Sequence, residues 1–162
     1  MGRKGQIWSM DFTVSLMIFL TALFAVMFAW NYISLDTRET QTMKDMQLKA
    51  LALSDSLIRT PGLPSDWGQG DVQVVGLARE ENVLNATKVD YFVSMSIYDY
   101  DRLRGLMDIG FYDFYFEVSD INGTVYHNTT IPVSNTSVIV VPIERYAVYN
   151  DRIVKVRFII WT

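Results

Sequence analysis

The feature that most constrains this chain is an apolar segment near its N-terminus. No Asp, Glu, Lys or Arg occurs between Phe12 and Leu35. A helix rises about 1.5 Å per residue, so this segment would reach about 36 Å and cover a hydrocarbon core of about 30 Å. A cleaved secretory signal fits less well, because its apolar region has only about 7–15 residues and ends in small residues. The segment therefore predicts one retained membrane span.

The charges around this span predict its orientation. Arg3 and Lys4 precede it, and the positive-inside rule places such residues in the cytoplasm. The rest of the chain is then extracytoplasmic. The whole chain has 14 Lys and Arg against 18 Asp and Glu, and this acidic balance does not favour nucleic-acid binding.

Composition also limits the chemistry of the chain. It contains no Cys, and its single His is His127, so the His and Cys ligand sets of ordinary zinc sites cannot be assembled. The Gly68-Gln-Gly70 sequence lacks the third glycine and the following helix of a phosphate-binding loop, and a turn is expected there. His127 is expected to be a solvated strand residue. We therefore expect no cofactor, no metal site and no enzymatic activity.

The predicted helix extends beyond the span. There is no Gly or Pro between Asp36 and Arg59, and apolar residues three and four positions apart form a stripe. Its members are Met43, Met46, Ala50, Leu53 and Leu57. The predicted helix covers 6–60, with its transmembrane and assembly part at about 12–35. A loop rich in Pro and Gly, 61–71, would end it.

Residues 72–162 predict a β-rich head domain, so the fold class is α+β with an antiparallel sheet. We expect a strand over 71–78, and a helical stretch after it that begins at Asn85 or Thr87 and can divide in two. Asn122-Gly123 predicts a type I′ turn after a strand over 111–120. The last two β-rich runs, 137–148 and 152–161, predict a hairpin, with Pro142 at an edge or a bulge.

Two sets of polar residues are candidates for metal binding or for covalent modification. Asp99, Asp101, Asp108 and Asp113 do not have the spacing of a calcium-binding loop, so a solvated acidic face is expected. Four Asn-X-Ser/Thr sequences are candidates for N-glycosylation on the outer domain, at Asn85, Asn122, Asn128 and Asn135. Asn and Ser or Thr are also common in turns, and turn geometry alone would explain Asn122.

The opening sequence MGRKGQIWSMDF combines a short basic stretch, a glycine, Gln6 and an acidic residue before the long apolar segment. It resembles the class III, prepilin-type signal peptide of the archaeal type IV pilin-like family. Leu57–Pro64, Tyr112–Phe116 and Val154–Arg157 are similar to segments of the ectodomains of that family. The resemblance implies a leader of residues 1–5 and cleavage between Gly5 and Gln6.

The same resemblance implies a structural subunit, a major or minor pilin, of a surface filament with roles such as adhesion. Its partners would be copies of itself or other pilins, a prepilin peptidase, a pilus assembly ATPase and a membrane platform protein. The subunit would lie in membrane lipid before assembly and would then enter an extracellular filament. The expected assembly contacts are made by Asp11, Phe12, Leu16, Phe19, Leu20, Leu23, Phe24 and Met27.

Asp11 departs from the pattern of this family, in which the acidic residue is commonly Glu at the fifth mature position. Cleavage after Gly5 places Asp11 sixth, and residues 6 and 11 are about 140° apart around a helix. Asp11 is therefore expected to pair with the Gln6 ammonium of an adjacent subunit. The alternative is a headgroup position, where the helix dipole favours an anion.

Two other functional classes remain open. The chain can be a non-polymerising, membrane-anchored extracytoplasmic binding module, with Tyr91, Tyr98, Tyr100, Phe111, Tyr112 and Tyr115 as aromatic contacts. These aromatic residues are equally expected in the core of the head. An anchored hydrolase is the least favoured class, because the sequence offers no coherent acid, base and nucleophile.

Overall fold

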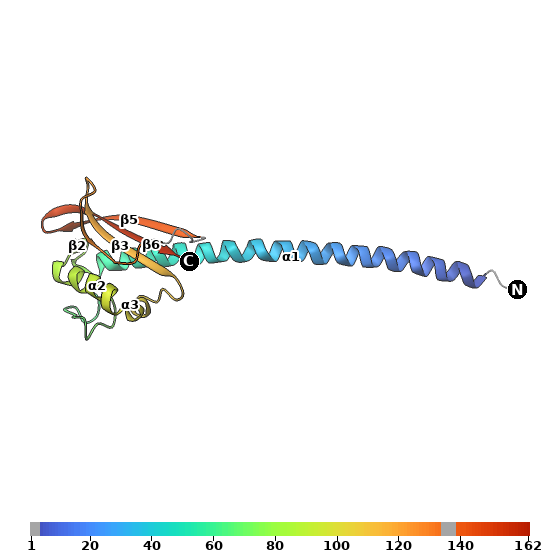
Figure 1. The fold of residues 1–162 in the computed structure, drawn as a ribbon, viewed down its shortest axis with the longest axis horizontal. Coiled ribbons are helices and arrows are strands. Elements are labelled where there is room, and N and C mark those ends of the chain that lie inside the picture. The colour runs from blue at the N-terminus through green and yellow to red at the C-terminus, as the bar shows by residue number, and fades with distance from the viewer. Residues whose placement is uncertain (1–3, 134–138) are drawn as a thin grey trace. The chain divides into compact units, whose positions relative to one another are not determined.

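The computed structural model describes residues 4–133 and 139–162, and for 4–9 and 33–40 it describes the backbone alone. In chain order its elements are α1 (Lys4–Arg59), β1 (Ala78–Glu80), β2 (Val83–Leu84), α2 (Ala86–Tyr98), α3 (Tyr100–Leu106), β3 (Asp113–Asp120), β4 (Val125–Asn128), β5 (Val140–Tyr149) and β6 (Arg152–Trp161) (Figure 1). The chain divides into two compact units, Met1–Thr42 and Met43–Thr162, and α1 contributes to both. The expected α+β class is confirmed.

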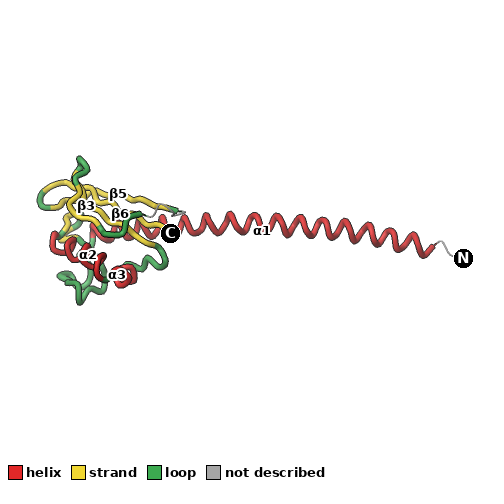
Figure 2. Tube along the Cα trace, viewed as in Figure 1, coloured by secondary structure: helices red, strands yellow, loops and turns green. Residues whose placement is uncertain are grey.

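The second unit contains a six-stranded sheet in the order β1-β2-β5-β6-β3-β4. Its strands are drawn in yellow in Figure 2. Its centre is antiparallel: β6 pairs along its length with β5 on one side and β3 on the other. The short strand β2 pairs parallel to β5 through Val83 and Val148. The sheet is therefore mixed, and the prediction of an antiparallel sheet is wrong at this edge.

The C-terminal hairpin is confirmed, and its turn is the one that adopts the type I′ pattern. Asn150 and Asp151, between β5 and β6, have φ of 49° and 60°. A two-residue loop with both φ values positive matches the twist of the flanking strands. Pro142 pairs with Ile159 on β6, and no described strand pairs with its other side. The expected edge position of Pro142 is confirmed.

The Asn122-Gly123 turn differs from its prediction. Only Gly123 has a positive φ, of 95°, so the turn is not type I′. The Gly123 N–H donates to the Asp120 carbonyl at 3.1 Å, and the Asp120 carboxylate accepts from the N–H groups of Asn122 and Thr124 at 2.7 and 3.0 Å. The N–H of Thr124 is the main cause of the lowered pKa of Asp120. A side-chain cap therefore determines this turn.

The two short helices are confirmed, and Asn85 is the N-cap. Its Oδ1 accepts from the N–H groups of Thr87 and Lys88 at 3.0 and 3.4 Å. These groups are among the first N–H groups of α2, which have no partner inside the helix. Asp99 separates α2 from α3.

The strand expected over 71–78 is wrong. Only Val74 forms a bridge, with Leu63, and β1 begins at Ala78. The backbone of this segment hydrogen-bonds to the C-terminal end of α1 instead: the Leu77 N–H donates to the Leu57 carbonyl at 2.8 Å. The last carbonyls of a helix lack internal partners, so a neighbouring segment that supplies N–H groups completes the helix end.

The core of the second unit lies between the sheet and helical residues. Met46, Ala50 and Leu57 of α1 are buried there, which confirms the inner face of the predicted stripe, although Met43 is exposed. Phe92 of α2 packs edge-on against Phe116 of β3, with ring centroids 4.9 Å apart. Large apolar side chains of this kind each contribute about 1.5–3 kcal/mol when fully buried. The second unit therefore has its own hydrophobic core.

Gly76→Ala is expected to destabilise the head. A Cβ at position 76 would meet the carbonyl oxygen of Thr60 and the backbone nitrogen of Gly62, which side-chain rotation cannot relieve. The expected loss is about 1–3 kcal/mol in the free energy of unfolding, measured by thermal or chemical denaturation in detergent. Gly105→Ala is the matched control, because its Cβ meets nothing within 4 Å in α3. Equal stability of both variants would contradict this packing.

Candidate functional site

The first unit presents an apolar helical surface. Met10–Tyr32 of α1 forms a 23-residue segment with a mean hydropathy of 2.4, and none of it is buried. At about 1.5 Å per residue it is about 35 Å long, enough to cross a bilayer. By length and composition, this is a helix apolar enough to span a membrane.

The apolar residues expected to make assembly contacts are all exposed, by 40 to 67 % of their surface. They are Phe12, Leu16, Phe19, Leu20, Leu23, Phe24 and Met27. At 100° per residue they occupy a stripe about 140° wide. Met17, Ile18 and Phe28 are exposed outside this stripe, so the helix is apolar on all sides. Such a surface is suited to lipid or to packing among other helices.

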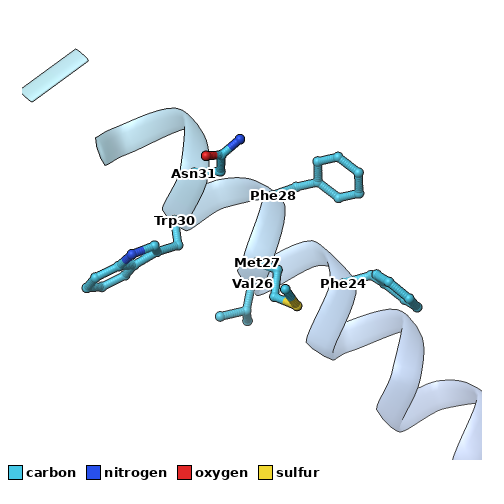
Figure 3. A pocket seen from close by; sticks show the side chains of 6 residues that line it. All are labelled: Phe24, Val26, Met27, Phe28, Trp30 and Asn31. Carbon is cyan, nitrogen blue, oxygen red and sulfur yellow. The ribbon is translucent and has the colours of Figure 1, made fainter. Parts of the chain in front are cut away.

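The C-terminal part of this segment has the bulkiest side chains. Phe24, Val26, Met27, Phe28, Trp30 and Asn31 line a shallow apolar hollow. Figure 3 shows Phe28 and Trp30 projecting to different sides of α1 instead of converging on an enclosed cavity. The hollow is therefore a feature of an uncovered helix surface.

The structure describes only part of the expected processing site. Lys4 and Gly5 are the first residues of α1, whereas Arg3 lies outside the described residues and the Gln6 side chain is not described. Asp11 is exposed and lies at the second position of the apolar segment. Its pairing with a Gln6 amine stays a prediction.

In the head, a buried lysine that sequence analysis missed holds a loop in place. The Nζ of Lys88, on α2, donates to the carbonyls of Pro61 and Ser65 at 2.7 Å each and of Ala78 at 3.3 Å. Burial lowers the pKa of Lys88, and the charge of Asp66 opposes this shift. The sequence contained a signal, because Lys88 lies four residues before Phe92 on the apolar face of a predicted helix.

Trp67, a residue of this loop, also stabilises it. Its indole N–H is shared between the carbonyls of Pro61 and Gly76, at 3.0 and 2.9 Å. Trp67 and Lys88 are both almost fully buried, and both bind the Pro61 carbonyl. A buried N–H donor without a partner would cost about 1–3 kcal/mol, so these bonds keep residues 61–78 against the head.

His127 lies in β4, as expected, but it is partly buried rather than solvated. Its Nε2 is 2.6 Å from the Tyr149 hydroxyl, and its Nδ1 is 3.5 Å from a carboxylate oxygen of Asp90. This arrangement resembles a base between an acid and a hydroxyl group. Burial raises the pKa of Tyr149, however, so its phenol is not activated as a nucleophile. We interpret the three residues as a link between α2, β4 and β5.

The four carboxylates considered for calcium do not converge. Asp101 and Asp113 lie 3.7 and 3.6 Å from Arg104, and Asp99 lies 3.5 Å from Arg102. Asp108 is exposed, and its backbone carbonyl, not its carboxylate, accepts from Lys49. Among the described residues there is no group of three or more His, Cys, Asp or Glu that could hold a metal ion.

The candidate glycosylation residues differ in their surroundings. Asn122 and Asn128 are exposed, Asn85 is the partly buried cap of α2, and Asn135 lies outside the described residues.

The aromatic residues of the alternative binding function differ in their exposure. Phe111 and Tyr98 are 100 % and 85 % exposed, whereas Tyr91, Tyr100, Tyr112 and Tyr115 are partly buried.

Comparison with known proteins supplies no relative. No protein-family model, curated protein or solved structure matches this chain. The functional conclusion therefore rests on the residues and geometry of the chain itself.

The stability of the head is expected to fall between about pH 10 and 12, partly through Tyr100. Burial raises the pKa of Tyr100 to about 12, and its phenol donates to Asp113 at 3.2 Å. Because the fold favours the neutral phenol, this contribution is complete below the unfolded pKa of about 10 and is lost as the pH rises to about 12. Tyr100→Phe should reduce the fall in unfolding free energy by an amount on the order of 1 kcal/mol, since solvent screens a half-exposed group.

The measurement is the difference in unfolding free energy between pH 9 and pH 12 for the full chain in detergent. Tyr98→Phe is the control, because Tyr98 is 85 % exposed. If Tyr100→Phe and the unmodified chain lose the same stability over this range, the assigned role of Tyr100 is wrong.

Proposed function

We propose that this protein is a structural subunit, a major or minor pilin, of an archaeal type IV pilus-like surface filament. The observation that carries this proposal is the fully exposed apolar segment Met10–Tyr32, in a chain whose second unit has its own core. The segment needs a cover of lipid or other helices, while the head needs neither. The resemblance of residues 1–12 to a class III signal peptide supports a pilin over an ordinary anchor.

One apolar helix serves the two states of such a subunit. In the membrane, lipid surrounds all sides of Met10–Tyr32, and in the filament the same segments of other subunits replace the lipid. Leu, Val and Phe side chains suit both surroundings, because lipid and neighbouring helices both remove apolar surface from water. Met10, Met17 and Met27 are exposed and unbranched, so they can adapt to irregular helix contacts.

Processing before Gln6 provides the link between export and assembly. Cleavage removes Arg3 and Lys4 and creates an α-amine with an unperturbed pKa of about 7.7–8.0, largely protonated near neutral pH. A carboxylate at the bilayer centre costs about 2.5–3.5 kcal/mol, and less near the edge. The Gln6 ammonium of an adjacent subunit would offset this cost at Asp11, and the uncut precursor has no such cation at Gln6.

The proposal defines the partners and the location. The chain is the substrate of a prepilin peptidase at Gly5 and Gln6, and it supplies no catalytic residue. A pilus assembly ATPase and a membrane platform protein drive its polymerisation with copies of itself or other pilins. It begins as a single-pass membrane protein with a cytoplasmic N-terminus and ends in an extracellular filament.

A second candidate function is a non-polymerising, membrane-anchored binding module. Two exposed aromatic residues favour it, Tyr98 at the end of α2 and Phe111 in the loop before β3. Large exposed aromatic side chains are common in binding surfaces. A processed chain that persists as a monomer in membranes would support this candidate over the filament subunit.

Gly5→Leu should block processing and filament formation together. Leu places a bulky side chain directly before the expected cut, where the chain now has Gly5, so this variant should retain Met1 and stay in the membrane. The measurements are the N-terminal sequence of the membrane protein and the amount of subunit in the sheared surface fraction. Gly2→Ala, outside the cleavage site, is the control. Abundant filaments of uncut Gly5→Leu protein would contradict the proposed processing.

Asp11→Ala tests the pairing with a neighbouring amine. If pairing drives assembly, this variant should be cut before Gln6 at the normal rate but yield far fewer filaments, by about tenfold or more for each 1.4 kcal/mol lost per contact. Asp11→Glu is the matched variant, because it keeps the carboxylate and should retain more assembly. Filaments of Asp11→Ala at the unmodified level would show that Asp11 is only a headgroup residue.

A further inference from the structure

The β3–β4 hairpin carries two of the Asn-X-Thr sequences. Asn122 and Thr124 lie in its turn, and Asn128 and Thr130 lie at and just beyond the end of β4. All four side chains belong to exposed residues. Each sequence therefore presents its acceptor asparagine and its third residue, Thr124 or Thr130, to solvent, whereas the middle residue Thr129 is buried against β3.

The polar contacts of these two asparagines are surface contacts. The Asn122 side chain hydrogen-bonds to the carboxylate of Asp120, a partly exposed residue at the end of β3. The Asn128 side chain donates to the Thr129 carbonyl at 3.4 Å and interacts with the Tyr115 phenol. Water can replace such contacts at little cost, because the net value of an exposed hydrogen bond is small. Asn128 pairs with Glu117 in the β3–β4 ladder through its backbone, and neither asparagine side chain caps a helix or completes a strand ladder.

Asn85 has the opposite surroundings. Its Oδ1 accepts two N–H groups of the first turn of α2, and its backbone N–H donates to the Leu77 carbonyl at 2.8 Å. Ala86 and Thr87 are already helical. An enzyme that needs an extended Asn-X-Thr segment would have to unwind this turn and lose a cap worth about 1 kcal/mol. The same turn carries the buried Lys88 and Val89, which oppose unwinding.

We propose that the β3–β4 hairpin is the glycosylated edge of the head, with Asn122 and Asn128 as acceptors and Asn85 unmodified. This inference rests on the proposed function, because it requires an extracytoplasmic head. The donor is a sugar linked to a lipid phosphate or diphosphate. The carboxamide nitrogen bonds to C1 of the sugar as the C1–oxygen bond to phosphate breaks, the lipid phosphate leaves with the electron pair, and the nitrogen loses one proton.

The glycans would cover an exposed apolar part of the same hairpin. Ile121, Val125 and Tyr126 are 71, 47 and 38 % exposed, although β4 is an edge strand of the sheet. Exposed edges and apolar side chains favour pairing with other chains, and natural sheets cover or charge them. Within Val125–Asn128, no side chain is Lys, Arg, Asp or Glu. Glycans on Asn122 and Asn128, which lie on either side of Val125 and Tyr126 in the sequence, would provide this cover.

The test uses the protein from its own cells and three matched variants that keep each asparagine. Thr124→Ala and Thr130→Ala should each remove one glycan from the intact mass, whereas Thr87→Ala should remove none. Glycopeptide mass spectrometry should place the sugars on Asn122 and Asn128. The Thr124→Ala/Thr130→Ala double variant should keep its melting temperature and form larger oligomers of the detergent-solubilised protein in sedimentation experiments.

External protease on intact cells separates this inference from the proposed function. A head that is digested from outside but carries no sugar on Asn122 and Asn128 would overturn the inference and leave the filament proposal standing. A glycan on Asn85 would overturn the inference that the helix cap at Asn85 prevents its modification. A head that is protected in intact cells would overturn both proposals. Unchanged oligomer size in the double variant would contradict the proposal that the two glycans cover the exposed apolar side chains of the hairpin.

Discussion

The constraint on which this protein depends is that Met10–Tyr32 cannot remain in water. The segment is apolar on all sides, and no described part of the chain buries it. Each Leu, Phe or Met side chain left in water forgoes about 1.5–3 kcal/mol of burial free energy. A lipid bilayer and a bundle of equivalent helices are the two surroundings that satisfy such a helix. Both are available to a subunit that is first inserted in a membrane and then assembled.

The head differs from this segment, because its apolar residues are covered within the second unit itself. It has its own core, and its loop after α1 is fixed by bonds to backbone carbonyls instead of by apolar contact alone. Lys88 and Trp67 both bind the Pro61 carbonyl, and the close approach of Gly62 and Gly76 leaves no space for a side chain. The N–H groups of residues 77 and 82 bond to carbonyls in the last turn of α1, and that of residue 78 bonds to the carbonyl of the residue after it, Thr60. These interactions hold the head without help from the membrane.

Local sequence signals predicted much of this fold. The apolar run, the absence of Gly and Pro up to Arg59, the Asn85 cap and the two C-terminal β-rich runs each act over a few residues, and each element forms as expected. The failures are non-local. The 71–78 segment has the alternating pattern of a strand. It forms no strand before Ala78, and the N–H of Leu77 bonds to the Leu57 carbonyl at the end of α1. Asn122-Gly123 reads as a type I′ turn, but the Asp120 carboxylate caps a different one. The parallel β2–β5 pair had no local signal.

The features of the candidate site also fall into those that local sequence predicts and those that depend on distant residues. The exposed stripe of α1 followed directly from composition, whereas Lys88 and the His127–Tyr149 bond depend on residues far apart in sequence. The central claim is that this chain is cut before Gln6 and polymerises through its apolar helix. The most direct test is the intact mass and N-terminal sequence of the protein recovered from sheared surface filaments. The account predicts abundant subunit beginning at Gln6. Absence from that fraction, with Met1 still attached in membranes, would contradict it.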